Sequence, residues 1–146
     1  MAFRTLAPTP RVRNAEARGS LRVGVHVVSG KTNDPSAVFG LTFVVGVDLL
    51  AKFGWKINDR ILTQEGTGTD LGTFLLTKSD KTTGTTKLTW NSGPKDSPET
   101  AVMKINIVHT QTLRHIRSPI SLEPATYQVF GGQVFVCVPW AKEPEA

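Results

Sequence analysis

The sequence predicts a mainly β protein, a small β-barrel or sandwich-like domain with one short helix. Apolar and polar residues alternate with the period of two that is typical of half-buried strands, most clearly over residues 21–28 and 133–138. Short segments rich in Gly, Asn, Asp and Pro separate these runs and indicate turns. The 146 residues, 39% of them hydrophobic, are enough for one domain with its own core.

The predicted strands follow one another along the chain with one irregular interruption. They cover Leu21–Val28, Gly40–Val45, Arg60–Gln64, Leu71–Thr77, Thr86–Trp90, Ala101–Ile107, Tyr127–Phe130 and Gln133–Val138. The Gly/Thr-rich residues 65–70 predict a hairpin loop, and Gly131-Gly132 predicts a two-residue hairpin turn. Residues 110–124 look irregular.

The helix is expected over Val47–Phe53. Leu49, Leu50 and Phe53 form an apolar face, and Gly54 stands where a helix commonly ends in the left-handed conformation. Such a short helix is stable only when it packs on a sheet. Asn58 then predicts a turn residue with a positive φ.

The charge distribution divides the chain into an arm, a domain and a tail. The net charge is +5, and residues 1–22 hold five arginines against Glu16, a net charge of +4. We expect residues 1–20 to form a basic flexible arm, residues 21–140 a single β-rich domain and residues 141–146 a C-terminal tail. The arm arginines that could contact nucleic-acid phosphates are Arg4, Arg11, Arg13, Arg18 and Arg22. Alternatively, the arm is a solvated tail or docks on a neighbouring subunit.

Residues 39–77 resemble the AbrB/MazE type of swapped-hairpin DNA-binding module. In that family a strand and a short helix lead into a Leu-Gly-x-Lys-x-Gly-Asp-x-Val turn, and the chain here reads Phe-Gly-Trp-Lys-Ile-Asn-Asp-Arg-Ile over residues 53–61. Asn58 replaces the usual Gly, and Val45-Gly46 replaces the family's Ile-Pro before the helix. The chain is also similar to a group of uncharacterised small phage-encoded proteins.

The AbrB-type resemblance implies an intertwined homodimer that contacts DNA, and the likeness to the phage-encoded group implies a phage origin. Lys52, Lys56 and Arg60 lie on or next to the matching element, so it makes them candidates for phosphate contacts. Alternatively, they are solvated charges around a strand–helix–turn that serves structure alone.

Catalytic and metal-binding patterns are not found in the sequence. His26, His109 and His115 are scattered, and the expected state of Cys137, in a Val-rich strand, is a buried inert thiol. The glycine-rich residues 66–72 do not match a phosphate-binding loop. Trp55, Trp90 and Trp140 would stack on bases or pack in the core, and their positions favour the core.

We therefore expect a non-catalytic DNA-binding protein without a cofactor or a metal. A phage virion or assembly protein, or an inhibitor of a host protein, is the alternative, because the edges of small β proteins support assembly. No apolar run reaches the roughly 20 residues of a membrane helix. The single cysteine fits a reducing compartment, so a cytoplasmic location is expected, or the virion for a structural protein.

Overall fold

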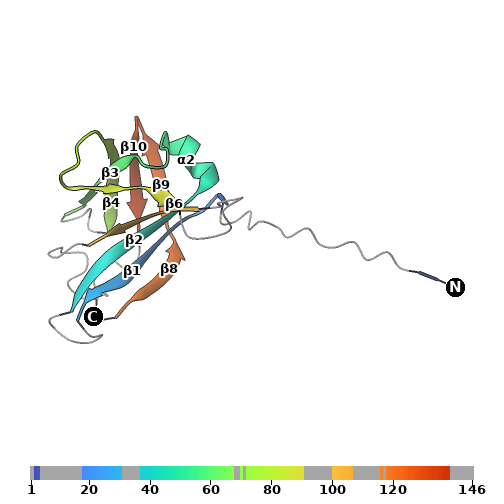
Figure 1. Cartoon of the computed structure of the whole chain (residues 1–146), viewed down its shortest axis with the longest axis horizontal. Coiled ribbons are helices and arrows are strands. Elements are labelled where there is room, and N and C mark those ends of the chain that lie inside the picture. Colours follow the sequence, from blue (N-terminus) through green and yellow to red (C-terminus); the bar gives the residue numbers. More distant parts are fainter. Residues whose placement is uncertain are drawn as a thin grey trace.

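The fold consists of two five-stranded antiparallel sheets packed against each other (Figure 1). The computed structural model describes residues 2–3, 18–30, 37–67, 70, 72–90, 100–106, 116 and 118–138. The strands are β1 (Leu21–Ser29), β2 (Val38–Gly46), β3 (Arg60–Glu65), β4 (Thr73–Ser79), β5 (Thr85–Lys87), β6 (Thr89–Trp90), β7 (Thr100–Ile105), β8 (Ile120–Pro124), β9 (Thr126–Phe130) and β10 (Gln133–Cys137). The predicted fold class, mainly β and barrel- or sandwich-like, is confirmed.

The two sheets are connected at two corners where a strand passes from one sheet to the other. Sheet A has the order β6-β7-β2-β1-β8, and sheet B has the order β5-β3-β4-β10-β9. Leu88 separates β5 from β6, and Ala125 separates β8 from β9. The Ala125 N–H donates to the Leu21 carbonyl at 3.0 Å, which fixes the second corner to the start of β1.

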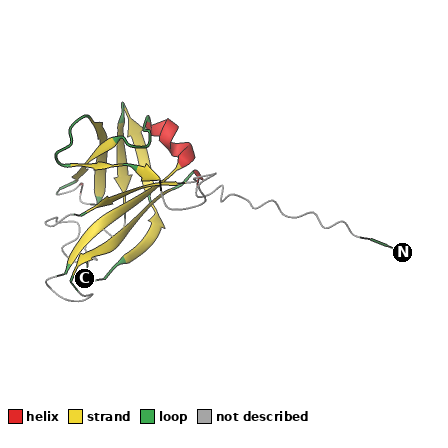
Figure 2. Ribbon diagram, viewed as in Figure 1, coloured by secondary structure: helices red, strands yellow, loops and turns green. Residues whose placement is uncertain are grey.

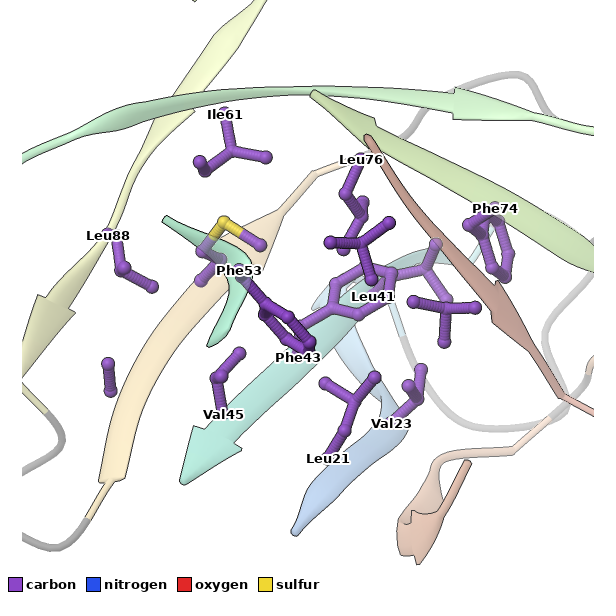
Figure 3. Close-up of a cluster of buried hydrophobic side chains, with 14 of the residues drawn as sticks. Leu21, Val23, Leu41, Phe43, Val45, Phe53, Ile61, Phe74, Leu76 and Leu88 are labelled. Carbon is purple, nitrogen blue, oxygen red and sulfur yellow. The ribbon is translucent and has the colours of Figure 1, made fainter. Parts of the chain in front are cut away.

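The core lies between the two sheets and is built from one side of each strand. Leu41, Phe43 and Val45 point inward from β2, and Phe74 and Leu76 point inward from β4 (Figure 3). The rings of Phe43 and Phe74 meet edge to face with centroids 5.8 Å apart, a favoured aromatic geometry. The expected inward face of the last hairpin is also found, because Val134, Val136 and Val138 are buried.

The helix α2 (Val47–Phe53) links sheet A to sheet B and has the predicted bounds (Figure 2). Its buried residues are the predicted Leu49, Leu50 and Phe53, and Gly54 ends it at φ 76°. Phe53 contacts Tyr127 of β9 with ring centroids 5.3 Å apart, and Figure 1 shows α2 beside that strand. The helix therefore covers part of the side of β9 that is not paired with β10.

The turn after α2 also has its predicted conformation. Asn58 has φ 77°, and the Lys56 N–H donates to the Asp59 carboxylate at 2.7 Å. The Asn58 N–H donates to the Leu88 carbonyl at 2.8 Å, so the turn is also tied to the first corner.

Three sequence predictions about local structure are wrong. The alternating residues 86–90 do not form one strand, because the chain changes sheets at the buried Leu88. Residues 120–124, expected to be irregular, form β8 by pairing with β1. Trp90 is not part of the core, since 44% of it is exposed at the two-residue edge strand β6, whereas Trp55 is buried as predicted.

Most of the predicted arm, residues 1–17 apart from 2–3, lies outside the described residues, as do the tail 141–146, His109, His115 and Trp140. Among the described helices, none has the length and apolar character needed to cross a membrane.

Candidate nucleic-acid interface

The side of sheet A that faces away from the core carries a group of basic and polar side chains. Core residues of β1 and β2 alternate with Arg22, His26 and Thr42, and the register places Lys104 of β7 directly beside Thr42. We call this side the outer face of sheet A, and it comprises Arg22, Gly24, His26, Gly40, Thr42, Val44, Val102 and Lys104.

His26 is held across this face by a polar partner at each ring nitrogen. Its Nδ1 lies 2.8 Å from Thr42 Oγ1, and its Nε2 lies 3.2 Å from Asn106 Oδ1. Because an amide oxygen only accepts hydrogen bonds, this arrangement places the ring hydrogen on Nε2 and leaves Nδ1 to accept from the Thr42 hydroxyl.

Gly40 leaves the space that the His26 ring occupies. A Cβ at Gly40 would lie 2.7 Å from His26 Nε2 and would also collide with the Ile105 carbonyl oxygen. Gly24 has a similar role at the other side, since its Cβ would lie 2.8 Å from the Ile120 carbonyl oxygen of β8. Both glycines thus allow close approach of a neighbouring group, which a larger residue would prevent.

A hollow of about 350 Å³ lies on this face between β8 and β7. Its lining includes His26, Thr42, Lys104 and Ser121, together with Val44 and Leu122. None of the described lining residues is acidic. Glu123 of β8 pairs with Val23, whose side chain faces the core. Because paired residues of neighbouring strands point to the same side of a sheet, Glu123 is not part of the outer face of sheet A. The hollow therefore combines a cation, hydroxyl groups and apolar walls.

Arg22 adds a second cation and an unpaired donor to the outer face of sheet A. Its Nε is buried and has no hydrogen-bond partner in the part of the chain that the structure describes. A buried donor without a partner costs free energy, about 1–3 kcal/mol for a typical group. An anionic acceptor would bind an accessible part of this guanidinium through a charge-assisted bond, while the buried Nε itself stays out of its reach.

The other predicted cations do not join this face. Arg60 projects from the opposite side of the molecule, on sheet B, where its Nε donates to Thr85 Oγ1 at 3.0 Å. Arg18 pairs with Asp48 of α2 at 3.3 Å, and the Lys52 ammonium lies 5.2 Å from the Tyr127 ring centroid. Lys56 is exposed in the turn after α2. Arg4, Arg11 and Arg13 lie outside the described residues.

The sequence pointed to Arg22 but missed Lys104, His26 and Asn106 as its companions. His26 and Asn106 are 80 positions apart, and Lys104 meets Thr42 only through the pairing of β7 with β2. The alternation of apolar residues marked two faces on each strand, and it offered no signal for which polar residues of different strands would become neighbours.

The outward side of sheet B differs sharply in composition. Residues of β4, β9 and β10 on this side form a hollow of about 520 Å³, lined by Thr73, Thr126, Tyr127, Gln128, Phe130, Gln133, Phe135 and Cys137. None of these lining residues carries a charged side chain at neutral pH. Cys137 is exposed here, with its Sγ 3.5 Å from Thr73 Oγ1, so the expectation of a buried thiol is wrong. The alternation was correct, but none of the described residues forms a layer over this face.

The described residues contain no group of three or more His, Cys, Asp or Glu side chains that could hold a metal ion. Comparison of the chain with protein-family models, with curated proteins and with solved structures finds no match.

Proposed function

We propose that this protein is a non-catalytic nucleic-acid-binding protein that contacts phosphates through the outer face of sheet A and the arginine-rich residues before it. The observation that carries the proposal is that two cations, Arg22 and Lys104, share the outer face of sheet A and that the hollow beside Lys104 has no acidic residue in its described lining. The resemblance of residues 39–77 to AbrB-type modules supports DNA as the polyanion. The likeness to small phage-encoded proteins supports a phage origin, and the single cysteine fits a cytoplasmic location.

The spacing of the two cations suits a charged backbone. Arg22 and Lys104 lie two strands and two residues apart, which corresponds to about 12 Å between their Cα atoms. Two long side chains separated in this way reach more than one phosphate of a single strand, whose charges follow each other every ~3.4 Å along the axis of a duplex. In the sequence, four further arginines, Arg4, Arg11, Arg13 and Arg18, precede Arg22.

The residues around the cations give the site its remaining chemistry. Thr42 and Asn106 orient His26, and Ser121 adds a hydroxyl group at the edge of the hollow. Val102 and Leu122 provide apolar surface against which a sugar or base can pack. These groups bind and orient a ligand, and the proposal assigns none of them a chemical step.

Fluorescence anisotropy with labelled duplex and single-stranded DNA tests the proposal. We expect binding that weakens between about 50 and about 200 mM salt, because each neutralised phosphate releases counterions. Lys104→Ala and Arg22→Ala should weaken binding to all sequences and reduce the salt slope by about one each. The matched control is Lys87→Ala, which removes a lysine from sheet B and should leave affinity and slope unchanged.

Affinity that does not depend on salt would contradict the proposal, as would equal losses in Lys104→Ala and Lys87→Ala. In that case a second function becomes the better one, a structural protein such as a virion or assembly component, or an inhibitor of a host protein. The observation that favours it is the uncharged hollow on sheet B. Interfaces between proteins are depleted of charged residues at their centres and enriched in aromatic ones.

A further inference from the structure

The side chain of His26 lies across the outer face of sheet A. His26 pairs with Gly40 of β2, and a Cβ at Gly40 would lie 2.7 Å from His26 Nε2 and 2.8 Å from His26 Cε1. The ring therefore occupies the space directly above the Gly40 backbone. Its Nδ1 meets Thr42 of β2, whereas its Nε2 meets Asn106, which follows β7 on the far side of β2.

The two polar contacts also determine the plane of the His26 ring. Hydrogen bonds to an imidazole lie close to the ring plane, because the N–H and the lone pair both point along it. Thr42 and Asn106 belong to neighbouring strands, so a plane through both contacts runs roughly parallel to the sheet. One face of the ring thus rests on Gly40, and the other face is turned away from the sheet. His26 lines the 350 Å³ hollow, so a ligand in the hollow has access to the ring.

A flat aromatic ring held in this way is suited to stacking with a nucleobase. Nucleic-acid-binding proteins stack unpaired bases on the rings of Phe, Tyr, Trp and His. Because Thr42 and Asn106 already fix the ring, binding would cost little further loss of side-chain freedom. The same two contacts occupy both ring nitrogens, which leaves neither of them to read the edge of a base. Stacking on His26 should therefore tolerate any base.

A cation lies within reach of the nucleotide whose base would stack on this ring. The ring lies over β2, and Lys104 stands on β7 directly beside Thr42, one strand spacing of about 4.8 Å away. The flexible Lys104 side chain can therefore contact the phosphate of the same nucleotide. Val102 and Leu122 line the hollow next to Lys104 and offer apolar surface to the sugar.

Two other exposed aromatic side chains are placed less favourably for this purpose. Phe130 is 59% exposed, but it lies on sheet B beside a hollow without charged lining residues. Trp90 is 44% exposed and pairs with Ala101, whose side chain faces the core. Neither ring shares the outer face of sheet A with Lys104, which leaves His26 as the ring that does.

We infer that the outer face of sheet A binds single-stranded nucleic acid, with one unpaired base stacked on the His26 ring and its phosphate bound by Lys104. A duplex does not offer such a base, because its bases are paired and stacked inside the double helix. The inference rests on the proposed function and names the form of nucleic acid that the site binds. It differs from the duplex contacts expected of an AbrB-type module.

Fluorescence anisotropy with two oligonucleotides of equal length and charge tests the stacking. One consists of thymidine nucleotides, and the other has the same sugar-phosphate backbone without bases. At about 150 mM salt, where phosphate contacts alone are weakened, the thymidine oligonucleotide should bind more tightly. We expect a difference of about tenfold, the usual effect of stacking one base on an aromatic side chain. His26→Leu should abolish this difference, and His26→Phe, which keeps a ring, should retain most of it.

The matched control is Phe130→Leu, which removes an exposed aromatic ring from sheet B and should bind both oligonucleotides like the wild type. Urea denaturation of each variant checks that it is folded. Deoxyuridine and ribouridine oligonucleotides then show whether DNA or RNA binds more tightly, since they differ only in the 2′-hydroxyl group.

The outcomes separate this inference from the proposed function. Salt-dependent binding that is equal for the thymidine and the base-free oligonucleotide would overturn the inference and leave the proposed function intact. A duplex of the same length that binds more tightly than the single strand at about 150 mM salt would do the same. So would a His26→Leu variant that keeps the tenfold difference, or one that loses affinity for both oligonucleotides equally, as a purely structural role predicts. Absence of binding to either oligonucleotide, even at low salt, would overturn both proposals.

Discussion

Replacing Gly40 by alanine tests how the candidate interface is built. The added Cβ would collide with the Ile105 carbonyl oxygen of β7 and would lie 2.7 Å from His26 Nε2. The carbonyl belongs to a paired strand and cannot move without disturbing the β2–β7 ladder. The His26 ring can rotate away, but it then loses its contacts with Thr42 and Asn106.

The expected cost follows from these two contacts. Overpacking a well-packed site costs about 1–3 kcal/mol. Losing the hydrogen bonds of His26 adds about 1 kcal/mol for each bond. The reduced freedom of the unfolded chain returns roughly 0.4–1 kcal/mol. We therefore expect Gly40→Ala to lower the free energy of unfolding by about 2–4 kcal/mol, a large part of the roughly 5–15 kcal/mol of a typical domain.

Urea denaturation of four proteins measures this effect: wild type, Gly40→Ala, His26→Ala and the double variant. In His26→Ala the ring is already absent, so only the collision with the Ile105 oxygen remains and Gly40→Ala should cost about 1–2 kcal/mol less than in the wild type. The free energy of unfolding comes from linear extrapolation, with equal m values as the check that all four proteins unfold alike.

Two results would refute this reasoning. If Gly40→Ala stays within about 0.5 kcal/mol of the wild type, the strands yield easily and the glycine is not required there. If it costs the same with and without the His26 ring, the ring is not held over Gly40, and the orientation of His26 on the outer face of sheet A loses its support.

Three further predictions concern the core, the turn and the thiol. Phe74→Ala should lower the free energy of unfolding by about 3–5 kcal/mol, because its fully buried ring packs against Phe43. Phe130→Ala, at an exposed position, should change the free energy of unfolding by less than about 1 kcal/mol. A small effect of Phe74→Ala in urea denaturation would contradict this packing. Asn58→Ala should lower the free energy of unfolding by about 1 kcal/mol, because φ at this position is 77°. Asn58→Gly should leave that free energy unchanged or raise it. Equal effects of the two substitutions in urea denaturation would mean that the left-handed conformation is not strained. Cys137 should react fully with a disulfide reagent in native buffer, and a thiol that reacts only after addition of denaturant would contradict its exposure.

The segment from Val47 to Asn58 was predictable residue by residue because its determinants are local. The apolar face of α2, the left-handed Gly54 and the positive φ of Asn58 each depend on neighbours within a few positions. The two-residue turn at Gly131-Gly132 belongs to the same group, with φ values of 52° and 86°.

The errors lie where distant parts of the chain decide the outcome. Alternation continues through residues 86–90 although the chain changes sheets at the buried Leu88, and Trp90 in the edge strand β6 stays exposed. β8 is exposed over most of its length, has no apolar alternation, and exists because β1 offers it an edge to pair with. The exposure of Cys137 depends on whether a layer covers sheet B, and the site around His26 depends on three strands coming together.

The pairing of β1 with β8 has a consequence for how the chain must fold during synthesis. Arg22 pairs with Pro124, so one side of β1 stays unpaired until the chain has been synthesised beyond residue 124. Pairings between such distant residues close slowly, and an unpaired apolar strand invites association with other chains meanwhile. A chain truncated before Ile120 would lack β8, β9 and β10 together, leaving β1 and β4 each open on one side. The nascent protein therefore depends on the arrival of residues 120–137, or on a chaperone that shields these two strands until those residues are made.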